Sequence, residues 1–400
     1  MTALTNKRDH LEALFRRYTD LASEVILKEE LLCAGVSVTQ EAAAILQHPW
    51  QTLLFEGGSY KLFRTVVQPP KVADSPYLVD RQAGEGAMLL DRTTKAVIAN
   101  VRSYPLTPGY VDKPFGTQGL RYGDIARPDG EVTPVEACNS GSECPACAQQ
   151  CLLRAQAADG TSFPIHARNP QAVANAAFEG YTMEDWPLLE EPLRISIDAG
   201  ARPLTYEGVP EEEFFLPYLE AINQRFRATK HKVLRMLPKP EQVERRFLAA
   251  GFATRAVPLG TWDAELFPKL HPEAAAYMPR NDWLMYLADA AYIYGGSTVY
   301  ADFEIGPELL SGRFESQAAA VASNKEAFRF LGGHGLLPRL FHRGRNGNRQ
   351  VPVEYFLEID RAWYEAWVQA QNSEPRGYVM GIGRNRFPHS AAWDVGRGGP

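Results

Sequence analysis

The stretch EVTPVEACNSGSECPACAQQC, residues 131–151, joins a short β-rich run to a loop that is dense in cysteine. Residues 131–137 are predicted to form a strand, and the loop follows at once. It holds four of the five cysteines of the chain, at 138, 144, 147 and 151. In parallel α/β folds the chemistry lies at the carboxyl ends of strands. This loop therefore stands where such a fold would hold a cofactor.

The spacing Cys138-x5-Cys144-x2-Cys147-x3-Cys151 allows three interpretations. A structural zinc site usually combines two CxxC pairs that lie a dozen or more residues apart, and only one pair is present. Simple core packing rarely places four cysteines in one loop. An iron–sulfur cluster is the preferred interpretation, because thiolates on a short loop can hold one [4Fe–4S] cube.

The choice of ligands decides the chemistry of the cluster. We predict Cys138, Cys144 and Cys147 as the metal ligands, which leaves one iron open to a substrate or a second cofactor. Cys151 lies about one helical turn after Cys147. It is interpreted either as a fourth ligand that closes the cluster or, preferably, as a core-facing helix residue. The isolated Cys33 is expected to pack in the core.

Composition limits the classes of function. The 400 residues suggest two or three domains, or one barrel with additions, and the apolar share of 45% is ordinary for a globular protein. A net charge of −6 argues against a dedicated nucleic-acid binder. We find no apolar run of about 18 residues and no signal-peptide pattern at the start. We therefore expect a cytoplasmic protein without a membrane partner, in a compartment where disulfides seldom persist.

Three regions are predicted along the chain. Residues 1–125 form an N-terminal α+β extension, which starts with a helical pattern at 11–25 and a second helix around 41–46. Residues 126–345 alternate between short β-rich runs and amphipathic helices. Residues 346–400 form one strong amphipathic helix and a loose tail. The role of residues 1–125 stays open between a cap, a partner-binding surface and a homodimer surface.

The middle region contains six strand candidates, at 131–137, 193–199, 231–237, 253–259, 298–305 and 336–342. Helix candidates lie between and after them, at 145–156, 170–180, 211–228, 240–250, 279–294 and 315–332. This alternation indicates βαβ units and a parallel sheet. Six strands are too few for an eight-stranded closed barrel. The predicted fold class is α/β, with a partial (β/α)6 TIM-like barrel.

A cysteine triplet after the first strand of a six-unit (β/α) barrel resembles the radical S-adenosylmethionine (SAM) superfamily. The usual triplet is CxxxCxxC, and the first gap of five residues here is a variant that resembles the biotin synthase-like branch. Ala146 stands where the family often has an aromatic residue. The resemblance covers residues 130–345. Within it, 260–310 looks like the region around the fourth and fifth strands of that branch, with Gly306-Pro307-Glu308 in place of Gly-Leu-Glu.

The resemblance implies a SAM site beside the cluster. Asp263 matches the position that binds the ribose hydroxyls, and Thr261 matches a neighbouring polar contact. Arg280 matches the arginine that pairs with the methionyl carboxylate, where a bidentate fork suits the geometry. Two simpler roles stay open: Asp263 could cap the following helix, and Arg280 could be a solvated residue at a helix start.

The end of the second strand departs from the family pattern. Many members have Gly-Gly-Glu-Pro there, whereas this chain has Gly200-Ala201-Arg202-Pro203. The backbone at Ala199 and Gly200 is predicted to replace the glutamate that binds the methionine amino group. Asp198 or Arg202 is left as a residue that faces the substrate instead.

The resemblance also implies the reaction. A radical SAM enzyme cleaves SAM reductively at a [4Fe–4S] cluster, and the 5′-deoxyadenosyl radical abstracts hydrogen from a small-molecule substrate. Cofactor or natural-product biosynthesis is the expected setting, with an external one-electron donor such as flavodoxin or ferredoxin. Tyr300, Asp302 and Glu304 alternate on the fifth strand and are predicted to face the substrate, although ion pairs in the core would also explain them. Arg339 and His342 on the sixth strand are further candidates.

Two functions of other classes remain open. One is a zinc-stabilised, non-catalytic binding or scaffold protein. The other is an electron-transfer protein whose four cysteines close the iron–sulfur cluster. The residues do not reveal the substrate or the reaction that follows hydrogen abstraction.

Overall fold

A computed structural model describes residues 7–46, 53–60, 62–67, 69, 71–81, 86–103, 114–115, 120–121, 126–127, 131–136, 169–181, 194–199, 205–206, 209–342, 345–346 and 349–371. The four loop cysteines, Gly200 and the helix predicted at 145–156 lie outside these residues. The chain divides into two compact units. The first comprises Met1–Pro105, Glu304–Gly333 and Arg339–Pro400, and the second comprises Leu106–Phe303 and His334–Pro338.

A largely parallel sheet organises the second unit. Its strands are β9 (Ala126–Arg127), β10 (Glu131–Glu136), β11 (Arg194–Asp198), β14 (His231–Arg235), β15 (Thr254–Gly260), β16 (Val299–Ile305) and β17 (Leu337–His342), and they lie in this order across the sheet. The pairs from β10 through β16 are parallel, while β9 runs antiparallel to β10 at the edge. The division between the units crosses β16 and β17. The prediction of an α/β protein with a parallel sheet is confirmed.

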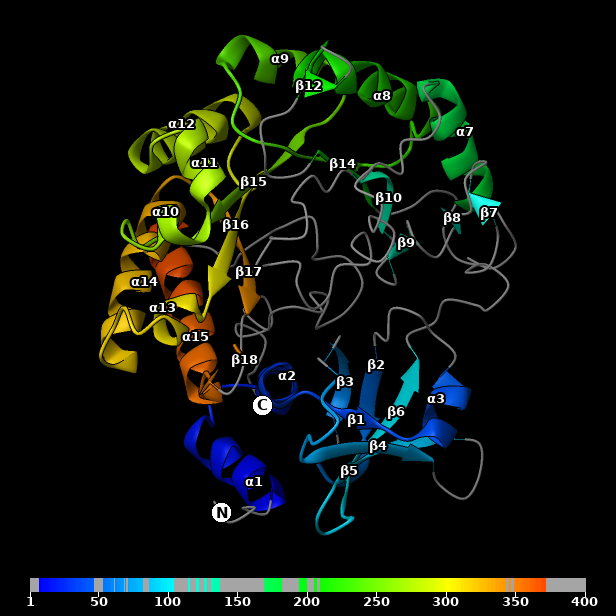
Figure 1. Cartoon of the computed structure of the whole chain (residues 1–400), viewed down its shortest axis with the longest axis vertical. Helices are drawn as coiled ribbons and strands as arrows, with labels where there is room; N and C mark the ends of the chain where they lie inside the picture. The colour runs from blue at the N-terminus through cyan, green and yellow to red at the C-terminus, as the bar shows by residue number, and fades with distance from the viewer. Residues whose placement is uncertain are drawn as a thin grey trace. The chain divides into compact units, whose positions relative to one another are not determined.

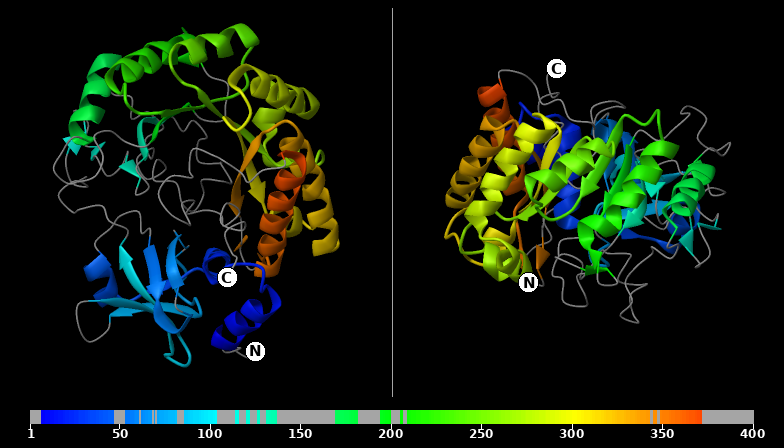
Figure 2. Two further views of the ribbon diagram at one scale, coloured as in Figure 1. Left: turned by 180° about the vertical axis from the view of Figure 1, so that it is seen from behind. Right: turned by 90° about the horizontal axis from the view of Figure 1, so that it is seen from above.

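Helices separate the parallel strands along the chain. They are α7 (Pro170–Tyr181), α8 (Glu211–Arg225), α9 (Glu241–Ala249), the short α10 (Phe267–Leu270) and α11 (Pro272–Tyr277), and α12 (Arg280–Tyr294). Figure 1 shows α7, α8, α9 and α12 on one side of the strands, and Figure 2 shows the same arrangement from behind. Because each new strand is added beside the previous one, the right-handed crossover rule places the connecting helices on one face.

Burial explains why these segments become strands. All seven residues of β15, TRAVPLG, are buried, which is typical of a parallel strand covered on both faces. Residues of β10, β11 and β14 share one core cluster with α7, α8 and α9. The strand ends at Gly260, whose φ of 77° is a conformation that few other residues adopt easily.

The first unit contains a second, mostly antiparallel sheet. Its strand order is β1 (Ser37–Val38), β4 (Tyr77–Arg81), β5 (Ala87–Asp91), β6 (Val97–Ser103), β2 (Leu53–Gly57) and β3 (Leu62–Val67). The N-terminal helices are α1 (Lys7–Arg17), α2 (Ser23–Ala34) and α3 (Gln40–Leu46). The helical pattern at 11–25 is therefore split between two helices. Polar residues at 19 and 20, which compete for backbone hydrogen bonds, favour a turn there.

Three later helices complete the first unit. They are α13 (Pro307–Leu310), α14 (Gln317–Gly333) and α15 (Val353–Gln371), and α15 packs against both α14 and α2. The buried Glu308 joins them, because Asn324 donates to its Oε1 at 2.9 Å and the Tyr355 hydroxyl donates to the same oxygen. The C-terminal helix that the sequence predicts is confirmed as α15.

Candidate functional site

Three charged side chains meet where parallel strands end. Asp198 is the last residue of β11 and Arg235 the last of β14, and the two are partners in the sheet register. Arg235 donates from Nη1 to Asp198 Oδ2 at 2.7 Å and from Nε to Asp302 Oδ2, on β16, at 2.5 Å. We call these three residues the Arg235 cluster. It occupies the edge of the sheet where parallel α/β proteins carry their chemistry.

The Arg235 cluster has a net charge of −1, because two carboxylates surround one guanidinium. Burial alone would lower the pKa of Arg235, but Asp198 and Asp302 outweigh it and hold that pKa above its ordinary value. Among the described residues, Nη2 of Arg235 makes no hydrogen bond, and 27% of the side chain is exposed. The guanidinium is thus fixed along one edge and open along another.

The three substrate-facing residues predicted on β16 have different positions. Asp302 belongs to the Arg235 cluster and is nearly fully buried. Tyr300 lies two residues earlier, on the same face by strand alternation, and is fully buried. Glu304 is half-buried and belongs to the first unit. The ion pair of Asp302 agrees with the core-pairing alternative, and its substrate contact stays a prediction.

Ala199 and Thr261 lie at the ends of neighbouring strands. The amide of Ala199 donates to the Arg235 carbonyl at 2.8 Å, so Ala199 extends the strand pairing next to the Arg235 cluster. Its partner in the prediction, Gly200, lies outside the described residues. Thr261 directly follows β15, and 3% of it is exposed. Both residues therefore stand at the carboxyl edge of the sheet.

Asp263 begins the segment after β15. Its Oδ1 accepts hydrogen bonds from the amides of Glu265 at 3.0 Å and Leu266 at 2.9 Å. These two bonds close the turn that precedes α10, which itself has no side-chain cap. Asp263 therefore caps this turn and not the helix, and a ribose contact stays a prediction.

Arg280, the first residue of α12, is oriented by Trp262. Its Nε donates to the Trp262 carbonyl at 2.6 Å, and its guanidinium carbon lies 4.5 Å from the centre of the Trp262 ring. Burial lowers the pKa of Arg280, and the nearby Asp263 acts in the opposite direction. Among the described residues, its two terminal nitrogens make no hydrogen bond. Arg280 is half-buried and oriented, so it is suited to bind an anion.

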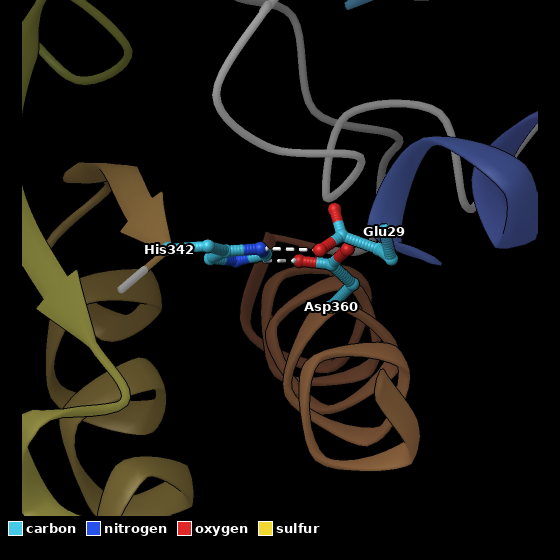
Figure 3. Close-up of side chains that lie close together, drawn as sticks. All are labelled: Glu29, His342 and Asp360. Atoms are coloured by element: carbon cyan, nitrogen blue, oxygen red, sulfur yellow. Dashed lines mark hydrogen bonds and ion pairs between the residues drawn. The ribbon is translucent and has the colours of Figure 1, made fainter. Parts of the chain in front are cut away.

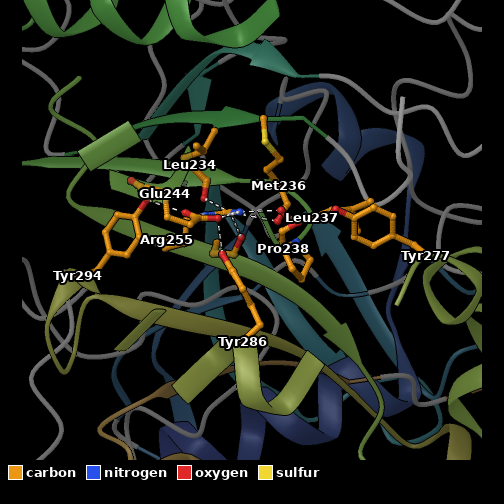
Figure 4. Close-up of polar contacts among 10 residues, drawn as sticks. Leu234, Met236, Leu237, Pro238, Glu244, Arg255, Tyr277, Tyr286 and Tyr294 are labelled. Carbon is orange, nitrogen blue, oxygen red and sulfur yellow. Dashed lines mark hydrogen bonds and ion pairs between the residues drawn. The ribbon is translucent and has the colours of Figure 1, made fainter. Parts of the chain in front are cut away.

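A second arginine supports the strand ends from the other face of the sheet. Arg255 on β15 is fully buried and pairs with Glu244 on α9 at 2.9 Å. It also donates to the carbonyls of Leu234, Met236, Ala256 and Leu237 at 2.8 to 3.1 Å, as Figure 4 shows for the cluster. These bonds fix the backbone immediately after Arg235. The sequence prediction missed this role, although a lone charge inside the apolar run at 253–259 was a visible signal.

A buried carboxyl lies near the turn after β14. Glu211, at the start of α8, is 1% exposed and pairs with Lys239 at 2.9 Å. Burial raises the pKa of Glu211 to about 7, against a smaller opposite effect of Lys239. The same lysine pairs with the half-buried Glu212 at 2.9 Å. Glu211 thus combines a buried position with an ion pair to Lys239.

Two late-strand candidates belong to the first unit. Arg339 and His342 lie on the part of β17 assigned to that unit, and His342 contacts Glu29 and Asp360. This group was not visible in the sequence, because its members are up to 331 residues apart (360 minus 29). Cys33 is buried in α2, which confirms the prediction that it packs.

Comparisons with known proteins add no family. The chain matches no protein-family model, and no curated protein is similar to it in sequence. None of the helices in the described part of the chain is both long and apolar enough to cross a membrane.

Proposed function

We propose that this protein is a radical SAM enzyme built on a partial (β/α)6 barrel, and that it acts on a small polar molecule. One observation carries the proposal. The strands from β10 to β17 follow one another without reversal, and the cysteine loop begins two residues after the first of them. An unreversed row of βα units is the arrangement from which barrels are made.

The donor set fits the cofactor. A CX5CX2C loop offers three thiolates within ten residues, which suits a [4Fe–4S] cluster with one open iron. When bound, the cluster supplies the electron that splits SAM into methionine and a 5′-deoxyadenosyl radical. In this proposal Cys138, Cys144 and Cys147 hold the cluster, and the protein orients the other parts.

Arg280 is the residue best prepared for the SAM carboxylate. Its Nε is engaged with Trp262, so the two terminal nitrogens point away from that bond and can form a bidentate pair. Asp263 caps the segment that follows β15, which fixes the loop between Thr261 and Arg280. In the proposed site this loop carries the ribose contacts.

The Arg235 cluster is the proposed substrate contact. Its two carboxylates can accept from a hydrogen-bond-donating group of a substrate. The open edge of Arg235 can donate to an acceptor on the same molecule. The proposed substrate is therefore a small molecule with both kinds of polar group, as in an amino acid.

Anaerobic reconstitution tests the function. With iron and sulfide, the protein should take up one brown cluster that dithionite bleaches, and it should then release 5′-deoxyadenosine from SAM. Alanine at Cys138, Cys144 or Cys147 should abolish both results, whereas Cys33→Ala, a cysteine buried elsewhere, should retain them. Loss of the cluster in Cys151→Ala would favour the electron-transfer alternative. A colourless protein with one zinc would support the scaffold alternative.

A second experiment tests the SAM site directly. Replacement Arg280→Lys keeps the charge but removes the fork, so SAM affinity should fall about 10-fold or more, which corresponds to at least about 1.4 kcal/mol. The matched control is Arg313→Lys, because Arg313 also lies over an aromatic ring, that of Phe314 at 5.3 Å. Equilibrium dialysis of the reconstituted variants with labelled SAM measures the SAM affinity of each. Equal affinities in the two variants would contradict the assignment.

A further inference from the structure

One histidine and two carboxylates from distant parts of the chain meet inside the first unit. Glu29 lies on α2, His342 is the last residue of β17, and Asp360 lies on α15. Figure 3 shows both carboxylates directed at the imidazole ring. Glu29 Oε2 lies 2.5 Å from His342 Nδ1, and Asp360 Oδ1 lies 3.5 Å from Nε2. Ligand atoms of all three residues lie within 4.8 Å of one another.

The group is closed to solvent. The side chains of Glu29 and Asp360 are 0% exposed and that of His342 is 1% exposed. The imidazole is also fixed in orientation, because it stacks on Phe356 with ring centres 4.4 Å apart and an angle of 16°. A buried imidazole beside two buried carboxylates is a set of donor atoms that transition-metal ions use in proteins. The fixed ring determines where such an ion can lie.

The contact with Glu29 orients the ring. If Glu29 is ionised, Nδ1 is the donor of this hydrogen bond, because a carboxylate only accepts. In a neutral imidazole the lone pair is then on Nε2, which is buried and makes no hydrogen bond within the described residues. That nitrogen faces Asp360 Oδ1, so a lone pair and a carboxylate oxygen confront each other across 3.5 Å.

The distance of 3.5 Å between Nε2 and Oδ1 matches two ligand atoms on one ion. A strong charge-assisted N–H···O bond would draw the two atoms to about 2.7–2.9 Å. A zinc ion bound at about 2.0–2.2 Å to each atom, with a tetrahedral angle, separates them by about 3.3–3.6 Å. A protonated ring that pairs with both carboxylates is the competing arrangement, and the test below separates the two.

We propose that Glu29, His342 and Asp360 form a site for one divalent transition-metal ion, separate from the cysteine loop. His342 Nε2 and the Asp360 carboxylate supply two of the ion's ligands. Glu29 holds the ring through Nδ1, as carboxylates behind metal-bound histidines commonly do. One imidazole nitrogen with carboxylate oxygen suits zinc, manganese or ferrous iron better than calcium or magnesium.

The test removes the thiolate sites first. In a tag-free chain with serine at all four loop cysteines, we expect one equivalent of zinc or manganese to remain after dialysis, measured by elemental analysis. Cobalt titration should give the weak visible bands of nitrogen and oxygen ligands, without a thiolate charge-transfer band. Because this chain cannot hold an iron–sulfur cluster, the result is independent of the proposed radical SAM function.

Graded variants separate the roles within the site. Asp360→Asn and His342→Ala should lose the ion, whereas Glu29→Gln should weaken its binding about 10- to 100-fold. The matched control is Glu30→Gln on the same helix, because Glu30 is buried but accepts from the Tyr77 hydroxyl at 3.0 Å instead. It should bind the ion normally.

Three outcomes would overturn the site. The first is a folded cysteine-free chain that binds no ion, which would mean that a protonated His342 pairs with both carboxylates. The second is unchanged binding in Asp360→Asn. The third is equal loss in Glu30→Gln. If the cysteine-free chain does not fold, elemental analysis of the native chain and of Asp360→Asn in that chain decides: the variant should hold one zinc or manganese equivalent fewer, and equal content would overturn the site.

Discussion

Arg235 and Arg255 lie on neighbouring strands but face opposite sides of the sheet. The register pairs Leu234 with Arg255 and Arg235 with Ala256, so the two arginines are one position apart. Strand alternation therefore directs them to opposite faces. Arg255 reaches Glu244 on helix α9, while Arg235 reaches the strand residues Asp198 and Asp302.

The two arginines differ in how far their hydrogen-bonding capacity is used. Arg255 makes six hydrogen bonds, two to Glu244 and four to backbone carbonyls, and is 0% exposed. Glu244 in turn accepts from the hydroxyls of Tyr286 at 2.5 Å and Tyr294 at 2.7 Å. Arg235 makes two hydrogen bonds in the described chain and keeps one nitrogen open.

This difference suggests that Arg255 supports the fold, whereas Arg235 can bind a ligand. A buried ion that is fully satisfied rigidifies the core but has no capacity left for a ligand. A partly satisfied ion at the carboxyl edge of a parallel sheet retains that capacity. The Arg255 network holds the backbone at Met236 and Leu237, directly after the residue that stays open.

The largest expected effect comes from breaking the closed network. Replacement Arg255→Met leaves Glu244 buried without its cation, so the free energy of unfolding should fall by about 3–5 kcal/mol. Urea denaturation followed by far-ultraviolet circular dichroism measures the change. The double variant Arg255→Met/Glu244→Leu should recover most of it, because no uncompensated charge remains. A loss below about 1 kcal/mol in the single variant would show that the network does not support the fold.

The sequence predicted the frame of the second unit well. All six predicted strands appear as β10, β11, β14, β15, β16 and β17, because continuous apolar runs between helical patterns are a local signal. The helix starts at α8, α9 and α12 follow prolines at 210, 240 and 279, which is also local information. The short helices α10 and α11 were missed, since four to six residues show little periodicity.

The candidate site was less predictable. Alternation along its own strand was enough to single out Asp302. Its partner Arg235 was missed, because the two side chains meet only through the register between neighbouring strands, which the sequence does not reveal. The group of Glu29, His342 and Asp360 requires contacts between a helix near residue 30 and elements beyond residue 340. Pairings of such sequence separation leave no pattern in a single sequence.

The buried carboxyl of Glu211 should make the stability of the fold depend on pH. Its folded pKa of about 7 lies above the ordinary value of 4.5, so the folded chain binds this proton more tightly. Stability from this group is therefore fully present below pH 4.5 and is lost as the pH rises through 7. Replacement Glu211→Gln should remove this loss, and the difference between about 7 and 4.5 sets its limit at up to about 3 kcal/mol.

Melting temperatures of both proteins between pH 5 and pH 8 measure the effect. The matched control is Glu212→Gln, which shares Lys239 but has a lowered pKa: burial alone would raise it, and the lysine outweighs burial. Glu212 should therefore add stability at neutral pH and lose it as the pH falls. If Glu211→Gln is instead destabilising at pH 8, its pairing with Lys239 must outweigh its burial.

The smallest effect on stability, and the most diagnostic for function, is expected at the open arginine. Replacement Arg235→Lys keeps a cation between Asp198 and Asp302, so the free energy of unfolding should fall by less than in Arg255→Lys. A lysine at position 255 has only three donors and cannot replace the six hydrogen bonds of Arg255. Arg255→Lys should therefore lower the free energy of unfolding clearly more than Arg235→Lys. In the proposed enzyme, Arg235→Lys should still cleave SAM without substrate, but it should lose the substrate-dependent increase in 5′-deoxyadenosine. If Arg235→Lys unfolds as easily as Arg255→Lys, both arginines support the fold, and the Arg235 cluster is no substrate contact.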